Sequence, residues 1–262
     1  MIDLDIYQVD AFADRPFAGN PAAVVPLESW LPDVVLQGIA AENNLAETAF
    51  FIEDNGDADF HLRWFTPTVE VDLCGHATLA SGSVLFNHRG WPKDRIVFQS
   101  RSGPLAVSRD GDRYLLDFPS KPAVDVAMPD GLADAIGCVP QRYLRATMNM
   151  AILESESAVL AVNPDLAFIA AMEGDGLIVS APGDTSDCAS RYFAPHAGID
   201  EDPVTGSAHC TIVPYWADVL DRKDIYARQV SKRGGDLYCR LEGDRVSIAG
   251  NTALYLTGRI RV

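Results

Sequence analysis

Two segments, each with an aspartate shortly before a glycine, are candidates for binding an anion. Asp72–His76 and Asp202–Ser207 each lead into a stretch that is apolar nearly all round and starts with a glycine, Gly75 or Gly206. A buried helix beginning at such a glycine turns unpaired backbone N–H groups and the positive end of its dipole toward a ligand. Two such helix starts facing one cavity would hold a carboxylate and stabilise an enolate formed beside it. The alternative is that Asp72 and Asp202 only cap their helices.

Glu47 is a candidate general base. It stands where a loop enters the apolar stretch Thr48–Ile52, and burial at that point would suit its carboxylate to proton transfer. The alternative is an exposed glutamate at the end of a loop.

The remaining polar residues of these segments are His76, Asp202 and Ser207. They suggest a Ser-His-Asp hydrolase, but the sequence has no G-x-S-x-G elbow. It also has no H-E-x-x-H, G-x-G-x-x-G or Walker pattern, so no catalytic metal or nucleotide is expected. Five scattered cysteines without C-x-x-C spacing argue against a disulfide framework and a structural zinc site.

The elements that must position these residues are mostly short strands separated by Gly, Pro and Asp-rich turns. Helices are predicted over Pro32–Asn43, Pro164–Met172, Gly75–Phe86 and Gly206–Val219, and the last two are apolar enough to be buried. The predicted strands are Leu4–Phe12, Ala22–Leu27, Thr48–Ile52, Asp59–Phe65, Arg95–Gln99, Leu105–Ser108, Arg113–Phe118, Ala151–Glu154, Ala158–Val162, Gly176–Ser180, Asp187–Phe193, Asp236–Leu241, Arg245–Ala249 and Ala253–Val262.

The pattern occurs twice along the chain. Arg63–Pro67 precedes the first buried segment, and Arg191–Pro195 precedes the second with the same Arg-aromatic-Phe-x-Pro order. The two pieces are 128 residues apart and the glycines 131, which is half of the 262-residue length. We therefore predict an α+β protein of two pseudo-symmetric half-domains, residues 1–118 and 119–262, each a mostly antiparallel sheet wrapped around a central helix. The last strand is a candidate to cross back to the first half.

The composition and net charge limit the kinds of partner that the protein can be expected to bind. The net charge of −16 disfavours nucleic acid and anionic membranes, yet a local cluster of N–H donors can still bind a small anion. No apolar run is long enough to span a bilayer, and the acidic start is unlike a signal peptide, so a cytoplasmic protein is expected. We expect a homodimer, since two-fold dimers dominate among homo-oligomers.

Several motifs resemble, in order and over nearly the whole chain, those of the PhzF-like phenazine biosynthesis family. They are Asp10–Phe12, Gly19–Val25, Leu45–Phe50, Arg63–Pro67, Asp72–Thr78, Asp202–Ala208 and Arg233–Gly235. The resemblance implies a fold like that of diaminopimelate epimerase, with an active site between two halves. It also implies a cofactor-independent isomerase that moves a proton on a small carboxylate-bearing metabolite, with no metal.

By the same resemblance, Glu47 is the proton-shuttling acid/base, while His76, Asp202 and Ser207 orient the substrate. Gly75 and Gly206 would supply backbone N–H groups. Epimerases of this fold use one thiol from each half; Cys74 stands at the first place, but Thr205 stands at the second. An epimerase or racemase using Glu47 and Cys74 is therefore one alternative, and a non-catalytic ligand-binding module is another.

Overall fold

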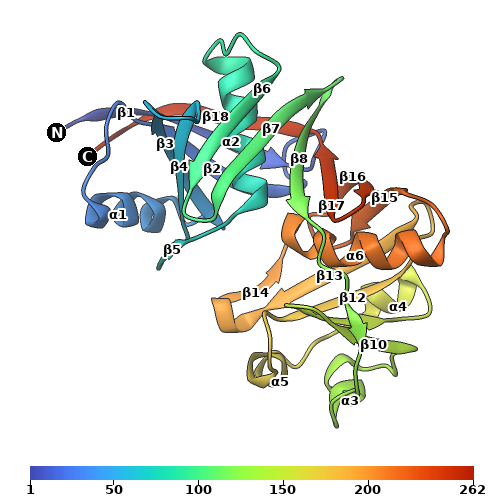
Figure 1. Cartoon of the computed structure of the whole chain (residues 1–262). Coiled ribbons are helices and arrows are strands. Elements are labelled where there is room, and N and C mark those ends of the chain that lie inside the picture. The colour runs from blue at the N-terminus through green and yellow to red at the C-terminus, as the bar shows by residue number, and fades with distance from the viewer. The chain divides into compact units, whose positions relative to one another are not determined.

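The computed structural model describes residues 1–262, which fold into two compact units (Figure 1). The first consists of Met1–Asp117 and Ala249–Val262, and the second of Phe118–Ile248. Each contains many strands and one long helix, and most strand pairs are antiparallel. The predicted α+β fold class is confirmed. No helix has both the length and the apolar character needed to cross a membrane.

In the first unit the strands pair in the order β18–β1–β2–β3–β4–β6–β7–β8, with β5 beside β4. Only β2/β3 and β4/β6 are parallel. The elements are β1 (Asp3–Ala11), β2 (Asn20–Pro26), α1 (Asp33–Asn43), β3 (Glu47–Glu53), β4 (Phe60–Phe65), β5 (Glu70–Val71), α2 (Gly75–His88), β6 (Arg95–Ser100), β7 (Gly103–Asp110), β8 (Arg113–Pro119) and β18 (Thr252–Arg261).

In the second unit the order is β9–β10–β11–β12–β13–β15–β16, with β14 beside β13 and with β11/β12 and β13/β15 parallel. The elements are β9 (Val124–Asp125), α3 (Leu132–Ile136), β10 (Arg142–Arg145), β11 (Asn149–Ile152), α4 (Glu156–Ala161), α5 (Leu166–Ala171), β12 (Leu177–Pro182), β13 (Cys188–Ala194), η1 (Pro195–Ala197), β14 (Ile199–Asp202), α6 (Gly206–Val219), β15 (Asp224–Gln229), β16 (Gly235–Glu242) and β17 (Arg245–Gly250).

The two units repeat one topology. The parallel pairs β2/β3 and β4/β6 of the first correspond to β11/β12 and β13/β15 of the second. In each, a short strand (β5 or β14) folds back on its neighbour just before the long helix. The C-terminal strand β18 pairs with β1, and so takes in the first unit the place that β9 takes beside β10 in the second.

Helix α2 is buried on every side from His76 to Phe86. Small residues allow the sheet to approach it closely: a Cβ added at Gly82 would lie 2.6 Å from Cγ1 of Val107 on β7. Helix α6 begins at Gly206 and ends at Val219, at the predicted residues, and buries most of its length. The prediction of a central helix in each half is therefore confirmed by the burial of the helix side chains as well as by the topology.

One predicted strand is wrong. Residues 158–162 lie largely in helix α4, which begins after Ser155 because the Ser155 hydroxyl accepts a hydrogen bond from the Ala158 N–H at 3.2 Å. Val159 of α4 is buried in one core cluster with Val179 and Ala181 of β12. Its apolar side chain therefore packs the helix onto the sheet and is not part of a strand. Helix α3 and strands β5, β9, β10, β14 and β15 were not predicted.

Candidate functional site

Three predicted site residues meet in the first unit. Glu47 is the first residue of β3, Cys74 precedes α2, and His76 lies in the first turn of that helix. Their side chains are buried, and one ligand-type atom from each lies within 4.8 Å of the others. Strand β3 pairs with β4, and β4 with β5, so the chain leaving β5 brings the start of α2 close to the start of β3.

The contacts run from sulfur through imidazole to carboxylate. Sγ of Cys74 lies 3.5 Å from Nδ1 of His76, and Nε2 of His76 lies 3.1 Å from Oε2 of Glu47. The latter contact is an ion pair when His76 is protonated, and Oε2 accepts no well-aligned hydrogen bond. Glu47 is therefore a buried carboxylate held beside a histidine, and the alternative of an exposed loop-end glutamate does not apply.

Charge in this cluster follows from burial and proximity. Burial, and next the Glu47 carboxylate, raise the pKa of the Cys74 thiol to about 11, so the thiol is protonated at neutral pH. Burial lowers the pKa of His76, whereas the Cys74 sulfur, when ionised, and the Glu47 carboxylate raise it, and the net direction is upward. With the thiol protonated, the Glu47 carboxylate is the charge that acts on His76.

The start of α2 has no side-chain cap. The residue before the helix is Cys74, in an extended conformation, and no side chain bonds to the first-turn amides as a cap. Asp72 does not cap the helix: its exposed carboxylate lies 3.6 Å from Arg101. Gly75 is only half-buried. The first-turn amides can therefore face an anion, as the residue pattern predicts.

The second unit builds its helix start in the same way. Thr205 precedes α6 without a side-chain cap, and its hydroxyl donates instead to the buried carboxylate of Asp202. Ser207 is half-buried in the first turn, directly after Gly206. Asp202, Gly206 and Ser207 are thus neighbours.

Gln229 holds the loop before α6 and was not found from the sequence. Its side-chain amide is fully buried at the end of β15. Nε2 donates to the Asp202 carbonyl at 2.7 Å and to the Thr205 hydroxyl at 3.2 Å, while Oε1 accepts from the Thr205 N–H at 2.8 Å. These three hydrogen bonds hold in place the backbone of the loop that precedes α6.

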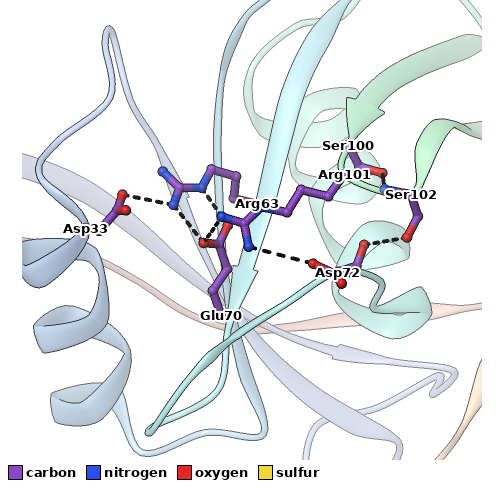
Figure 2. A network of polar contacts seen from close by, with 7 residues as sticks. All are labelled: Asp33, Arg63, Glu70, Asp72, Ser100, Arg101 and Ser102. Carbon is purple, nitrogen blue, oxygen red and sulfur yellow. Dashed lines mark hydrogen bonds and ion pairs between the residues drawn. The ribbon is translucent and has the colours of Figure 1, made fainter.

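In the first unit an arginine clamp holds the hairpin of β4 and β5, which precedes α2. Its contribution to the site was not found from the sequence. Figure 2 shows Arg63 bound to Glu70 through two hydrogen bonds, of 2.7 and 2.8 Å, and to Asp33 at 2.9 Å. Arg101 also contacts Glu70, and the Ser102 hydroxyl donates to the Asp72 carbonyl at 2.8 Å. Strand β5 and the loop before α2 are thereby tied to the rest of the unit.

The second unit repeats that clamp. Arg191 donates to both carboxylate oxygens of Glu201, at 2.7 and 3.0 Å, and also to the carbonyls of Val159 and Val162. The sequence repeat contained the signal, because Arg63 and Arg191 are the matching arginines of the two lead-in motifs. A bidentate Arg–carboxylate pair fixes geometry as well as charge.

The large groove of the first unit is not part of this site. It has a volume of about 880 Å³ and is lined by residues such as Leu27, Phe51, Glu53, Arg89 and Trp91. Phe51 and Glu53 lie at the end of β3, whereas Glu47 begins that strand, and none of the predicted site residues lines the groove. That the Glu47 cluster and the Asp202–Ser207 group face one cavity stays a prediction.

The spacing of Glu47 and Cys74 bears on the two-base alternative. Bases acting on opposite faces of one carbon, each about 3–3.5 Å from it, stand about 6–7 Å apart. Here the carboxylate and sulfur atoms lie within 4.8 Å, with the His76 imidazole beside both. The geometry favours one base with a charged neighbour over a pair of opposed bases.

Comparison with known proteins gives consistent matches. A family model described as "Phenazine biosynthesis-like protein" matches residues 9–258. An uncharacterized isomerase of Pseudomonas aeruginosa is 51% identical over 262 residues, covering 100% of both chains. A second uncharacterized isomerase of that organism is 46% identical over 261 residues, again covering 100% of both.

Solved structures show the same relationship. The crystal structure of a phenazine biosynthesis protein of the PhzF family from Enterococcus faecalis matches with a TM-score of 0.97 and 42% identity, covering 100% of both chains. A hydroxyproline epimerase from Agrobacterium vitis matches with a TM-score of 0.62 and 10% identity over 98% of this chain and 92% of its own, which shows a shared fold alone.

Proposed function

The chain belongs to the phenazine biosynthesis-like protein family, and from that premise we propose that it is a cofactor-independent isomerase. It would move a proton on a small carboxylate-bearing metabolite. Relatives of 51% and 46% identity over the full length are named isomerases, which supports this class of reaction.

The observation that carries the proposal is the buried pair of Glu47 and His76. A carboxylate used as a base must be ionised, within reach of the substrate and shielded from water. Oε2 of the buried Glu47 carboxylate lies 3.1 Å from Nε2 of His76, which gives the carboxylate a polar partner inside the protein. A purely binding module has no need of such a base.

The proposed reaction is a proton transfer by one base. Glu47 removes a proton from a carbon next to a carboxylated or conjugated centre, and the electron pair left behind is delocalised onto an oxygen. The uncapped amides at Gly75 and His76 stabilise that charge. Glu47, now neutral, returns the proton to a different atom, so that no cofactor is consumed.

Substrate orientation is assigned to the second unit. Asp202, Gly206 and Ser207 would bind the anionic group of the substrate, and the Gln229 bonds keep their loop in position. This step requires that the two groups of residues face one cavity. The substrate is accordingly proposed to be a small anionic metabolite.

An epimerase or racemase is the second candidate, because a hydroxyproline epimerase shares the fold. The short separation of Glu47 and Cys74 argues against that pair as its two bases. Incubating candidate amino acids in heavy water separates the two reactions: a racemase places deuterium at the alpha carbon without changing connectivity.

The test of the proposal is Glu47→Gln. This substitution keeps the shape and removes the base, so turnover should fall by about 10²–10⁴-fold while substrate still binds. Glu53→Gln, at the exposed far end of the same strand, is the matched control and should keep full activity. The assay follows, by NMR, proton exchange on a panel of small carboxylates.

A second variant examines the binding role. Ser207→Ala should raise KM with little change in kcat, since it removes a donor to the anionic group. Full activity of Glu47→Gln on a substrate that the wild type converts would overturn the mechanism. Ligand-induced thermal stabilisation without any product would support the binding-module alternative.

A further inference from the structure

The groove of the first unit lies away from Glu47 and has the size of a small-molecule pocket. It opens where β2 and β3 end, whereas Glu47 lies where β3 begins. Its volume of about 880 Å³ is within the range of about 300–1,000 Å³ that is typical of ligand pockets. All of its lining residues belong to the first unit. That unit by itself therefore forms a complete candidate binding site.

The inner surface of the groove is apolar and largely aromatic. It is lined by the buried side chains Leu27, Phe51, Phe60 and Leu85. The ring of Phe60 packs against the rings of Phe51 and Trp91, each at 5.3 Å between centroids. Apolar side chains bind the hydrocarbon part of a ligand, and the faces of aromatic rings also attract cations.

Two glutamates at the rim of the groove bring like charges together. In the parallel pair β2/β3, Pro26 lies opposite Phe51, and the Leu27 N–H donates to the Phe51 carbonyl at 2.9 Å. The same register, continued past the strand end, places Glu28 beside Glu53. Both side chains line the groove and are exposed, and neither carboxylate has a hydrogen bond or an ion pair. Like charges side by side repel each other, so a cation between them would stabilise the pair.

The positive charges around the groove already have partners. Arg89 and Arg259 line it, and both face Asp5, at 3.1 and 3.4 Å. Lys93 follows two lining residues and pairs with Asp59 at 3.2 Å. Helix α2 also ends here, and the C-terminal end of a helix carries partial negative charge. The two glutamates are therefore left with no counter-charge within ion-pair distance.

We propose that this groove binds a small organic cation, in which an ammonium group is joined to an aromatic or alkyl body. The ammonium lies between Glu28 and Glu53 and donates a hydrogen bond to each carboxylate, and the body lies against Phe51 and Phe60. An anion would be repelled by the two glutamates, and a neutral molecule would leave their charges unmatched. The proposal does not rest on the proposed isomerase activity, because no residue of that site lines the groove.

The binding test uses 2-phenylethylamine with the full-length protein, measured by calorimetry in low-salt buffer. Two probes of similar shape serve as controls: 2-phenylethanol, which is neutral, and 3-phenylpropionate, which is an anion. The amine should bind at least about tenfold more tightly than either, because only the amine forms hydrogen bonds between charged groups with the carboxylates. Added salt should weaken the binding of the amine, since charges at an open groove are screened.

Substitutions locate the bound amine. Glu28→Gln combined with Glu53→Gln should weaken its binding by about tenfold, because the carboxylates that accept from the ammonium are removed. The matched control, Glu42→Gln combined with Glu154→Gln, removes the same charge at two exposed positions outside the groove and should bind like the wild type. In the wild type, the methyl signals of Leu27 should shift in NMR spectra when the amine is added.

Three outcomes would overturn the proposal: no binding of the amine at millimolar concentration, equal affinity for the amine and either control probe, or equal losses in the two double variants. A doubled mass in light scattering that is lost in the groove variant, without amine binding, would instead assign the groove to a second copy of the chain. Circular dichroism checks that both double variants are folded.

Discussion

Glu47 and His76 depend on each other at the scale of single residues. A carboxylate without a partner in this buried position would favour its neutral form, and an imidazolium would lose its proton. Nε2 of His76 and Oε2 of Glu47 lie 3.1 Å apart, so each gives the other a polar partner in the interior. Cys74 contributes a protonated thiol beside them, which distinguishes it from the reactive thiolates found near exposed positive charge.

His209 shows the opposite behaviour. It is fully buried in α6, its Nδ1 lies 2.8 Å from the Thr205 carbonyl, and Nε2 has no partner. Burial lowers its pKa to about 4, and the Thr205 bond only partly offsets this. The neutral imidazole, with its proton on Nδ1, is the form that fits the folded protein.

A pH dependence of stability follows from His209. Its folded-state pKa lies below the unfolded value of 6.5, so the unfolded chain takes up a proton more readily. The stability contribution is complete above pH 6.5 and declines as the pH falls toward 4, by up to about 3 kcal/mol. Urea titrations between pH 7 and 4 should show a shallower decline for His209→Gln. Parallel pH profiles for the two proteins would contradict this.

At the scale of elements, the same three features position the starts of both long helices. They are a short strand, a clamp between an arginine and a glutamate, and a loop without a side-chain cap. Arg63–Glu70 and Arg191–Glu201 are both largely shielded from water. Each pair fixes the strand that precedes a helix start, and the helix amides are thereby left free for a ligand.

The fit between α2 and the sheet can be tested at Gly82. Gly82→Ala places a methyl 2.6 Å from Val107, so we expect a loss of about 1–3 kcal/mol in the free energy of unfolding. Gly38→Ala is the matched control in α1, where the added methyl meets nothing within 4 Å. That change should stabilise the protein by about 0.5–1 kcal/mol. Chemical denaturation measures both, and equal effects would refute the close-packing argument.

At the scale of the whole molecule, the C-terminal strand carries the clearest exposed apolar surface. Leu254, Tyr255 and Leu256 of β18 are 38%, 48% and 42% exposed, and Phe17, 73% exposed, packs edge-on against Tyr255. Strand β18 contains no acidic residue although the chain carries a net charge of −16, so this strand is where a second copy meets least repulsion.

We expect a homodimer that uses this surface. Light scattering at micromolar concentration should give twice the chain mass of 28.4 kDa, and Tyr255→Glu should shift the protein toward the monomer. Val34→Glu, at an exposed position of α1 in the same unit, is the control and should leave the mass unchanged. A monomeric wild type would contradict the expectation.

The sequence by itself determined the duplicated architecture and the two long helices. The matching lead-in motifs and the apolar stretches from Gly75 and Gly206 are local patterns, and local patterns suffice where burial is nearly complete. The predicted start and end of α6 are those observed. Residues 158–162 show the limit: a short apolar run suits strand or helix equally, and only the Ser155 cap and the packing of Val159 decided for a helix.

Tertiary structure alone decided what surrounds each candidate. The pairing of β3 with β4 and of β4 with β5 places Glu47 against His76, residues that no spacing rule connects. The same holds for Gln229, whose role depends on where β15 ends relative to α6. The tertiary structure also decided the protonation states. The pKa of a side chain is set by burial and by charges a few ångströms away, and those neighbours come from distant parts of the chain.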